Sequence, residues 1–499
     1  MTVGRAAALR RLGAAVVLGV IAAFGQAPYE FPIVLLVALT ALMLLFAKTV
    51  WPRQAALVGW GFGTGYFMHS MVWIVSPFLV DAPRHGWMAP FALVFLSAGL
   101  ALFWGGAFAF SRKLSANGWP LILCWPAVEL LRAYVLTGFP WGMFSQSLVE
   151  VMAGQALAWV GPYALTLWLI AAAVVLGLPG QRTARTRGVQ AALALVTGAL
   201  LVLPPRAVIA PMTDHHVRLI QPNAAQRDKW NPDMIPVFFN RQLGFTSAGP
   251  AEGMPPPDLI IWSETAIPWS LDLAGTALEE ISAAAQGVPV LMGVQRRSDT
   301  RYFNSAAVLG KRGEVQQVYD KHHLVPFGEY MPLGNLMANF GIHGLASREG
   351  NGYSAGPGAK LLDLGEIGRA LPLICYEAVF AHDVAAAPER PAFLIQMTND
   401  AWFGKGPGPL QHLAQARMRA IEQGLPMARV ANTGVSAMID PWGRITAMLP
   451  LNQAGYLDAV LPAPRRATPY SRSGDMPVAL LLLLSIMLLI IRKHRRDSD

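Results

Sequence analysis

The chain has few charged residues and almost no cysteine. Only 14% of its 499 residues are charged, whereas 54% are hydrophobic, and the mean hydropathy is positive. These values exclude an ordinary soluble domain, in which about a quarter of the residues are charged, and they predict a membrane protein. Of the two cysteines, Cys124 falls in an apolar run and Cys375 stands alone in the more polar part of the chain. A disulfide within that part is therefore excluded.

Long apolar runs occupy the N-terminal part of the chain and its C-terminal end. A helix needs about 20 apolar residues to cross about 30 Å of hydrocarbon. On that criterion the sequence predicts eight transmembrane helices, near residues 7–25, 31–47, 54–75, 89–110, 119–136, 157–178, 187–204 and 476–491. The first run resembles a signal peptide, but no small-residue cleavage site follows it, so we expect it to be retained.

Basic residues gather in alternate loops between these predicted helices. They open the chain and follow the second, fourth, sixth and eighth helices: Arg5, Arg10, Arg11, Lys48, Arg53, Arg112, Lys113, Arg182, Arg185, Arg187, Arg492, Lys493, Arg495 and Arg496. The positive-inside rule assigns such loops to the cytoplasm, so both termini are expected there and the stretch between helices seven and eight outside. The basic residues of these cytoplasmic loops explain the net charge of +9, so no nucleic-acid partner is expected.

The sequence divides into a membrane domain with seven helices (1–210), an outer domain (211–470), and an eighth helix with a basic tail (471–499). The outer domain contains short β-branched runs that end at Gly, Pro, Asn or Asp and read as strands. These runs are 215–221, 257–262, 288–294, 304–310, 315–320, 370–375, 392–398, 427–432 and 434–440. Helical patterns at 272–286 and 411–424 lie between some of them, which predicts an α/β layered domain.

Three reactive side chains stand where predicted strands end. Glu264 follows "DLIIWS", Lys321 follows "VQQVYD", and Cys375 closes "ALPLI". Strand ends in an α/β layer converge on one edge, so the three side chains can meet. A thiol with a pKa near 8.5 needs a base or a cation to act as a nucleophile, and a glutamate and a lysine supply both. Such a lysine can also stabilise the oxyanion of a tetrahedral intermediate.

Each of these residues also has an ordinary interpretation. A cysteine at a strand end is often a buried structural residue, and a lone glutamate or lysine there is often a solvated turn residue. The combination favours chemistry, because "IIWSETAIPW" and "YDKHHLVPFGEYMP" surround their charges with aromatic residues and prolines.

The motifs around these residues are similar to those of a known family. The order Glu264, Lys321, Cys375 resembles the Glu-Lys-Cys triad of the nitrilase superfamily, whose domain is an α-β-β-α sandwich. "WSETAIPW", "KHHLVPFGEYMP", "ICYE" and "TNDAWFG" with the "GPLQHLAQARMRAIEQG" that follows resemble one branch, the apolipoprotein N-acyltransferases. That branch carries the catalytic domain outside the membrane, between the seventh and eighth of eight helices. The resemblance extends over nearly the whole chain.

The resemblance implies a role for each matching residue. Glu264 corresponds to the general base, Lys321 to the oxyanion-stabilising lysine and Cys375 to the nucleophile. Further matches are an additional active-site glutamate, the pair after the nucleophile and a tryptophan of the substrate pocket: Glu329, Tyr376, Glu377 and Trp230. Pro222 and Lys405 depart from the family pattern, in loops outside the triad.

The implied reaction is ping-pong acyl transfer from a membrane phospholipid, through a thioester on Cys375, to the α-amino group of a diacylglyceryl-cysteine at the N-terminus of an apolipoprotein. The implied location is the bacterial inner membrane, with the catalytic domain on the periplasmic side, and no cofactor is expected. One alternative is a membrane-tethered amidase or nitrilase that uses the same triad with water as the acceptor. Another is a transporter or scaffold with a silent outer domain, although the predicted helices offer no evident ion path.

Four further features of the sequence have structural interpretations. His322 and His323 lack partners at metal-ligand spacing, so no metal site is expected. Glycines in "GWGFGTG" (59–65) lie in a predicted membrane helix and favour close helix packing over phosphate binding. Glu129 and Arg132 are three residues apart and are expected to pair on one helix face, either structurally or at a substrate. Residues 333–358 show no period and are either an active-site cover or a surface excursion.

Overall fold

The computed structural model describes residues 2–178, 183–332 and 352–498. The chain forms two compact units. The first consists of Met1–Ala207 together with Pro469–Asp499, and the second of Val208–Thr468. Most of the predicted segment 333–358 lies outside the described residues.

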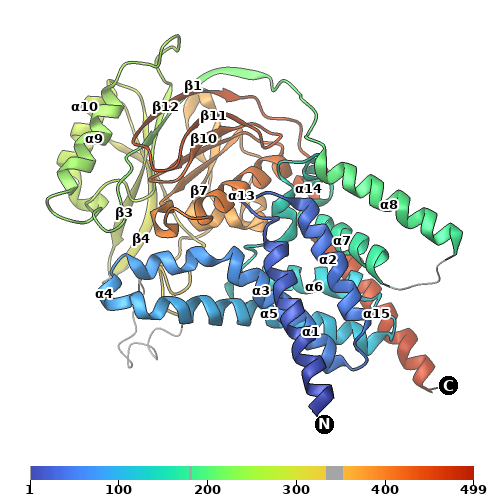
Figure 1. The fold of residues 1–499 in the computed structure, drawn as a ribbon. Coiled ribbons are helices and arrows are strands. Elements are labelled where there is room, and N and C mark those ends of the chain that lie inside the picture. Colours follow the sequence, from blue (N-terminus) through green and yellow to red (C-terminus); the bar gives the residue numbers. More distant parts are fainter. Residues whose placement is uncertain (1, 179–182, 333–351, 499) are drawn as a thin grey trace. The chain divides into compact units, whose positions relative to one another are not determined.

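The first unit is built from helices (Figure 1). Its longer helices are α1 (Thr2–Ala23), α2 (Pro32–Ala47), α3 (Pro52–Ser70), α5 (Ala89–Leu114), α6 (Leu121–Arg132), α7 (Leu157–Gly177), α8 (Ala184–Val202) and α15 (Met476–Ser498). Each predicted apolar segment coincides with one of them. Two short helices, α4 (Ala82–His85) and α14 (Pro469–Ser473), complete the unit with several 3₁₀ turns.

Four helical segments in the described residues are long and apolar enough to cross a membrane: Ala6–Ala23, Ala82–Leu114, Met152–Gly177 and Met476–Ser498. The shorter α2 is also apolar. Helix α6 has 12 residues where the sequence predicts a span over 119–136. At 1.5 Å per residue it is about 18 Å long, which is shorter than the hydrocarbon core. The number of membrane crossings therefore stays a prediction.

Buried aromatic rings form the centre of the helical unit. Trp104 of α5 packs on Trp125 of α6, and its indole nitrogen donates a 2.6 Å hydrogen bond to Glu129. Glu129 and Arg132 form a 2.7 Å ion pair with side chains only 1% exposed, and Arg132 also donates to the carbonyl of Trp141. The predicted pairing is confirmed. Its partners are residues of the bundle itself, which favours the structural role, because a buried charge needs such partners.

Glycines of α3 allow its two neighbours to approach closely. A Cβ at Gly65 would lie 2.1 Å from the carbonyl oxygen of Val16 in α1, and one at Gly63 would lie 2.8 Å from Ala101 in α5. Only a residue without a side chain fits at such contacts. The predicted role of "GWGFGTG" in helix packing is confirmed.

The second unit contains two six-stranded sheets. The first sheet has the order β12-β1-β2-β3-β4-β5, and the second has the order β11-β10-β9-β8-β7-β6. The strands of the first sheet are β1 (Met212–Gln221), β2 (Leu259–Trp262), β3 (Val290–Ser298), β4 (Arg301–Leu309), β5 (Val315–Asp320) and β12 (Gly455–Pro462). Those of the second sheet are β6 (Leu362–Asp363), β7 (Arg369–Ile374), β8 (Phe393–Thr398), β9 (Met427–Ala431), β10 (Ser436–Ile439) and β11 (Ile445–Leu449).

Three apolar clusters hold the layers of this unit together. The cluster between the sheets includes Leu219 and Ile261 from the first and Ile395 and Val430 from the second. A second cluster packs α10 (Gly275–Ala285) and α9 (Ile235–Ser247) on the outer face of the first sheet. A third packs α13 (Gly408–Gln423) on the second sheet. Because parallel strands are buried on both faces, they read as continuous apolar runs. The predicted α-β-β-α sandwich is confirmed (Figure 1).

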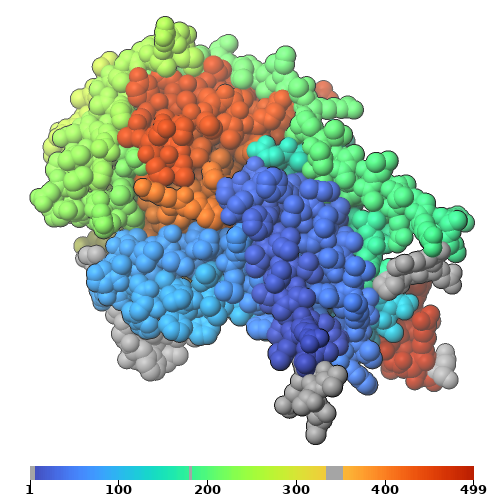
Figure 2. Space-filling view, viewed as in Figure 1, coloured from blue at the N-terminus to red at the C-terminus, as the bar shows by residue number. Residues whose placement is uncertain are grey.

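The last strand of the sandwich pairs with the first. Strand β12 runs antiparallel to β1, with Met212 opposite Pro462, so the two ends of the unit lie side by side. Tyr456 of β12 also donates a hydrogen bond to the carbonyl of Gly249. In Figure 2 the red-orange part of this unit lies directly against its yellow-green part. Strands β6, β11 and β12 and helix α9 are elements that the sequence patterns do not predict.

Candidate active site

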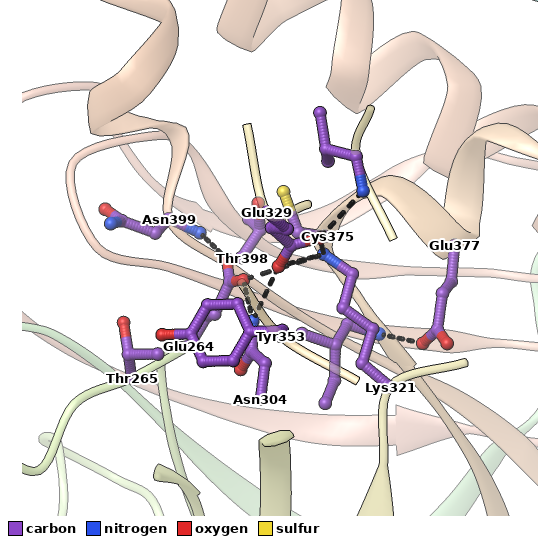
Figure 3. Close-up of polar contacts among 12 residues, drawn as sticks. Glu264, Thr265, Asn304, Lys321, Glu329, Tyr353, Cys375, Glu377, Thr398 and Asn399 are labelled. Carbon is purple, nitrogen blue, oxygen red and sulfur yellow. Dashed lines mark hydrogen bonds and ion pairs between the residues drawn. The ribbon is translucent and has the colours of Figure 1, made fainter. Parts of the chain in front are cut away.

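The three predicted reactive residues extend from the ends of strands in two different sheets. Glu264 is the second residue after β2 and Lys321 directly follows β5, both in the first sheet. Cys375 directly follows β7 in the second sheet, where its φ of 50° lies in the left-handed region. The sequence predicts convergence on one sheet edge. In the structure the residues instead approach from two sheets packed face to face, and they meet as expected (Figure 3).

The Glu264 carboxylate is fixed by hydrogen bonds to both oxygens. The side-chain amide of Asn304 donates to Oε1 at 2.7 Å, and the backbone N–H of Asn399 donates to Oε2 at 2.7 Å. Burial raises the pKa of Glu264, against the opposing effect of the Lys321 ammonium, and the Glu329 carboxylate adds to the rise. A carboxyl with a raised pKa is a better proton acceptor from a thiol than one in water.

Lys321 lies between two carboxylates. Its Nζ is 2.8 Å from Glu329 Oε2 and 3.9 Å from Glu264 Oε1, and its side chain is 1% exposed. Burial acts to lower the pKa of Lys321, but the two carboxylates and the nearby thiol outweigh it and the net pKa is raised. The side chain is thus a permanent cation beside the Cys375 sulfur (Figure 3).

The Cys375 thiol is buried and held in its protonated form. Burial raises its pKa well above the usual range and the Glu264 carboxylate raises it further, whereas Lys321 and a hydrogen bond with Thr398 act in the opposite direction. A base that took the thiol proton, such as the adjacent Glu264 carboxylate, would leave the thiolate beside the Lys321 cation. This arrangement is that of a nucleophile activated by an adjacent base.

The backbone around Cys375 is held by a buried polar network. Its carbonyl accepts a hydrogen bond from the Gln396 amide at 3.3 Å, and His412 Nε2 lies 3.1 Å from the same oxygen. His412 in turn contacts Asp400 at 2.9 Å, and Asp400 pairs with Arg429 at 2.6 Å. All of these side chains are buried, so movement of the loop after β7 would break both hydrogen bonds to the Cys375 carbonyl and disturb the network behind them.

Glu329 completes the site. Besides Lys321, its carboxylate accepts a 3.1 Å bond from Asn304 and a 2.8 Å bond from the backbone of Val325. Asn304 therefore bridges Glu329 and Glu264. The charges of Lys321, Glu264 and Glu329 sum to one negative charge, and the buried Lys229 ammonium lies close by, at the backbone carbonyl of Glu264.

Tyr376 and Glu377 directly follow the nucleophile in the chain, and both are buried. The Glu377 carboxylate is completely buried and accepts hydrogen bonds from the Tyr319 hydroxyl and the backbone N–H of His322, both at 2.8 Å, and from that of Ile374 at 2.7 Å. The Tyr376 ring packs edge-on against His323, with ring centroids 5.6 Å apart.

Trp230 lines a hollow and does not lie in the charged cluster. Its side chain is 40% exposed, and the hollow is lined mainly by apolar side chains, among them Ala224, Phe238 and Phe239. The neighbouring Lys229 also lines it, and its ammonium donates to the backbone carbonyl of Glu264 at 3.1 Å. Burial lowers the pKa of Lys229 to about 8.

Several functional residues carry no signal in the sequence. Asn304 lies within a strand and stands in no motif, whereas Thr398 and Asn399 open the "TNDAWFG" motif without being singled out by it. The structure also brings His323 next to His382 and Asp383, which are far from it in sequence. That proximity supplies the metal-binding spacing that the sequence lacks around His322 and His323.

The chain is similar to several known proteins. Residues 177–470 match the carbon-nitrogen hydrolase family, and residues 18–175 match the N-terminal domain of apolipoprotein N-acyltransferase. The chain is 37% identical to apolipoprotein N-acyltransferase of Rhodopseudomonas palustris over 98% of this chain and 96% of that one. It is 36% identical to the Brucella melitensis protein of the same name, over 98% and 97%. Among solved structures, an amidase from Nesterenkonia sp. matches at 16% identity and a TM-score of 0.37, over 52% of this chain and 96% of that one.

Proposed function

The chain belongs to the apolipoprotein N-acyltransferase family, and on that premise we propose that it transfers a fatty acyl group in two steps through a thioester on Cys375. The family establishes an acyltransferase of lipoprotein maturation that is associated with a membrane and acts on a lipoprotein. The proposal adds the residues and the order of the steps. Its main support is the contact of Glu264, Lys321 and Glu329 beside the Cys375 sulfur.

In the first step Glu264 removes the thiol proton, and the sulfur attacks the ester carbonyl carbon of a phospholipid. Negative charge develops on the carbonyl oxygen, and the Lys321 ammonium stabilises it. One well-placed donor of this kind contributes about 3 to 4 kcal/mol. The carbon–oxygen ester bond then breaks, and the alkoxide of the lysophospholipid takes the proton from Glu264. A thioester on Cys375 remains.

In the second step the α-amine of the diacylglyceryl-cysteine attacks the thioester carbon. An α-amine has a pKa near 8, so much of it is already neutral near pH 8. Glu264 accepts the proton that the attacking nitrogen loses, the carbon–sulfur bond breaks, and the proton returns to the sulfur. Glu264 therefore acts as a base and an acid in both steps, for which its raised pKa is suited.

The other predicted residues have supporting roles in this proposal. Glu329 holds Lys321 in position, and Glu377 and Tyr376 hold the backbone on which Cys375 stands. Trp230 borders the apolar hollow beside the Glu264 segment, where it can contact the acyl chain of a substrate.

We also propose eight membrane crossings, with both termini in the cytoplasm and residues 211–470 on the outer side. The alternating basic loops support this orientation. The pairing of β1 with β12 fits the insertion of this unit between two helices, because the chain enters and leaves it at the same place. Cysteines introduced by Asp81→Cys and Asp497→Cys test it. In intact cells a membrane-impermeant thiol reagent should label the first and not the second, and the reverse result contradicts the proposed orientation.

The reaction is tested by intact-mass analysis of the purified full-length chain after incubation with a dipalmitoyl phospholipid. The parent should gain one acyl group, and Cys375→Ser should gain none. Cys124→Ser is the matched control, because Cys124 is the other cysteine of the chain and is buried outside the site. Adding a diacylglyceryl-cysteine peptide should discharge the adduct to its amine. An adduct that is absent, or that persists in Cys375→Ser, contradicts the proposal.

A further inference from the structure

Three imidazoles surround one carboxylate beside the active site. His322 and His323 directly follow Lys321, and His382 and Asp383 belong to α12 (Ala381–Ala385), which follows the nucleophile segment. His323 Nδ1 is 2.7 Å from Asp383 Oδ2, His382 Nε2 is 3.6 Å from Asp383 Oδ1, and His322 Nε2 is 3.8 Å from the same atom. The proposed acyl transfer uses none of these side chains.

We propose that His323, His382 and Asp383 bind a divalent transition-metal ion of the zinc class. One ligand atom from each of the three residues lies within 4.8 Å of the others, so modest side-chain movement brings all three to one ion. Two imidazole nitrogens and one carboxylate oxygen form a donor set that zinc accepts, with a position left for water. Hard ions such as Mg²⁺ prefer all-oxygen sites, so they fit this set less well.

The exposure of the three side chains fits an ion that arrives from solvent. The Asp383 side chain is 9% exposed, that of His323 is 14% exposed, and that of His382 is 31% exposed. The carboxylate is therefore shielded, whereas His382 opens the group to water. A metal-binding group needs such an access path as well as its ligands.

Neighbouring residues fix the orientation of the proposed ligands. The His323 ring stacks on Phe380 at a centroid distance of 3.7 Å. His322 bridges Glu377 and Asp383, because its Nδ1 is 2.8 Å from Glu377 Oε1 while its Nε2 faces Asp383. Partners of this kind orient ligands around a metal and raise its affinity. His322 is thus an orienting residue in the proposed site, not a ligand.

The site would join the two segments that carry the catalytic lysine and cysteine. His323 is two residues after Lys321, and Asp383 is eight residues after Cys375. A bound ion would cross-link the loop after β5 to α12 and so limit the separation of these segments. Binding to the folded chain alone also raises its melting temperature.

Calorimetric titration of the chelator-treated full-length chain with ZnCl₂ in detergent tests the site. The parent should bind one Zn²⁺ per chain, and His382→Asn and Asp383→Asn should each weaken binding at least about tenfold. His215→Asn is the matched control, because His215 also lies beside a carboxylate, with its Nδ1 3.8 Å from Asp258, but in a pair that has only one imidazole. This variant should bind Zn²⁺ as the parent does.

A second readout covers the case in which Asp383→Asn fails to fold. Zn²⁺ should raise the melting temperature of the parent and of His215→Asn, but not that of His382→Asn. The proposal is overturned if the parent binds no Zn²⁺ in stoichiometric amount, which would leave the group a metal-free hydrogen-bonded cluster. Unchanged affinity in a folded His382→Asn overturns it as well. Either result leaves the proposed acyl transfer intact, because that reaction is measured by the adduct on Cys375.

Discussion

Replacement of Glu329 by glutamine tests how the charges of the site are shared. The substitution keeps the shape of the side chain, and its amide oxygen can still accept the bond from the Val325 backbone. It removes the carboxylate that lies 2.8 Å from Lys321 and leaves Glu264 at 3.9 Å. At an effective dielectric constant of about 20, unit charges at these separations attract by about 6 and about 4 kcal/mol. Glu329 is thus the closer and stronger partner of the lysine.

The expected loss of activity follows from these values. A well-placed donor at the oxyanion contributes about 3 to 4 kcal/mol to the transition state. Because Glu264 remains and keeps the ammonium in the site, we expect a loss at the lower end, about 3 kcal/mol, which corresponds to about a hundredfold slower thioester formation. The ammonium would then be drawn toward Glu264 and away from the oxyanion position.

The pH dependence separates this explanation from a general loss of structure. The Glu329 carboxylate contributes to the raised pKa of Glu264. Without it that pKa falls, and since Glu264 acts in its deprotonated form, activity should appear at lower pH than in the parent. The acidic limb of the pH profile of kcat/KM should therefore shift to lower pH.

Single-turnover thioester formation, followed by intact mass at a series of pH values, measures both effects. Glu366→Gln, which alters an exposed carboxylate, is the matched control and should behave as the parent does. A Glu329→Gln rate within about threefold of the parent would refute the charge-sharing argument. So would an acidic limb that stays in place or moves to higher pH.

Three other substitutions test the surroundings of the site. A Cβ in Gly293→Ala would lie 2.7 Å from the Cα of Glu264, so this variant should form the thioester at least about tenfold more slowly. The control is Gly275→Ala, whose Cβ would meet nothing within 4 Å and which should leave the rate unchanged. The pKa of Lys229 is lowered from 10.5 to about 8. Between about pH 8 and pH 10.5, Lys229 is protonated in the unfolded chain but largely neutral in the folded one. The free energy of unfolding of the parent should therefore increase by about 3 kcal/mol as the pH rises through that window. Lys229→Met should abolish this gain and raise the melting temperature at neutral pH. If the melting temperatures of the parent and of Lys229→Met change equally with pH, the lowered pKa of Lys229 is contradicted. Glu377→Gln should lower the free energy of unfolding by about 1.5 to 3 kcal/mol, measured in denaturant, because it loses charged hydrogen bonds.

The parts of the fold that the sequence predicts are those with a strong local signal. The buried strands β2, β7 and β8 read as apolar runs because both faces of their sheets are covered. Strand β11 is an edge strand in which half-buried and exposed residues alternate, and β6 has only two residues, so neither produces such a run. Strand β12 is mostly half-buried and is defined by its pairing with the distant β1. Long-range pairing of this kind leaves no local pattern.

The residues of the site also fall into those that a local sequence signal predicts and those that it does not. Glu264, Lys321 and Cys375 are predictable because each stands at the end of a strand, among aromatic residues or prolines. Asn304 is different, because it lies within β4, where no local pattern marks it. Its side-chain amide is needed because it donates to two carboxylates that come from other segments of the chain. The partners of His323 are equally distant, about 60 residues along the chain. Sequence patterns report what a segment does locally, whereas these residues are defined by what packs against them.

The conformation of Cys375 gives a physical reason for the carboxylate that follows it. A non-glycine residue with a φ of 50° costs about 1 to 3 kcal/mol, so the surrounding structure must hold it there. Glu377 does so from two residues away, because its carboxylate folds back to accept the backbone N–H of Ile374, the last residue of β7. The other oxygen accepts from Tyr319 and from the backbone of His322, next to Lys321. One buried carboxylate therefore ties the strand end that carries the thiol to the strand end that carries the ammonium. Charged hydrogen bonds of about 1.5 to 3 kcal/mol each are sufficient to offset the strain.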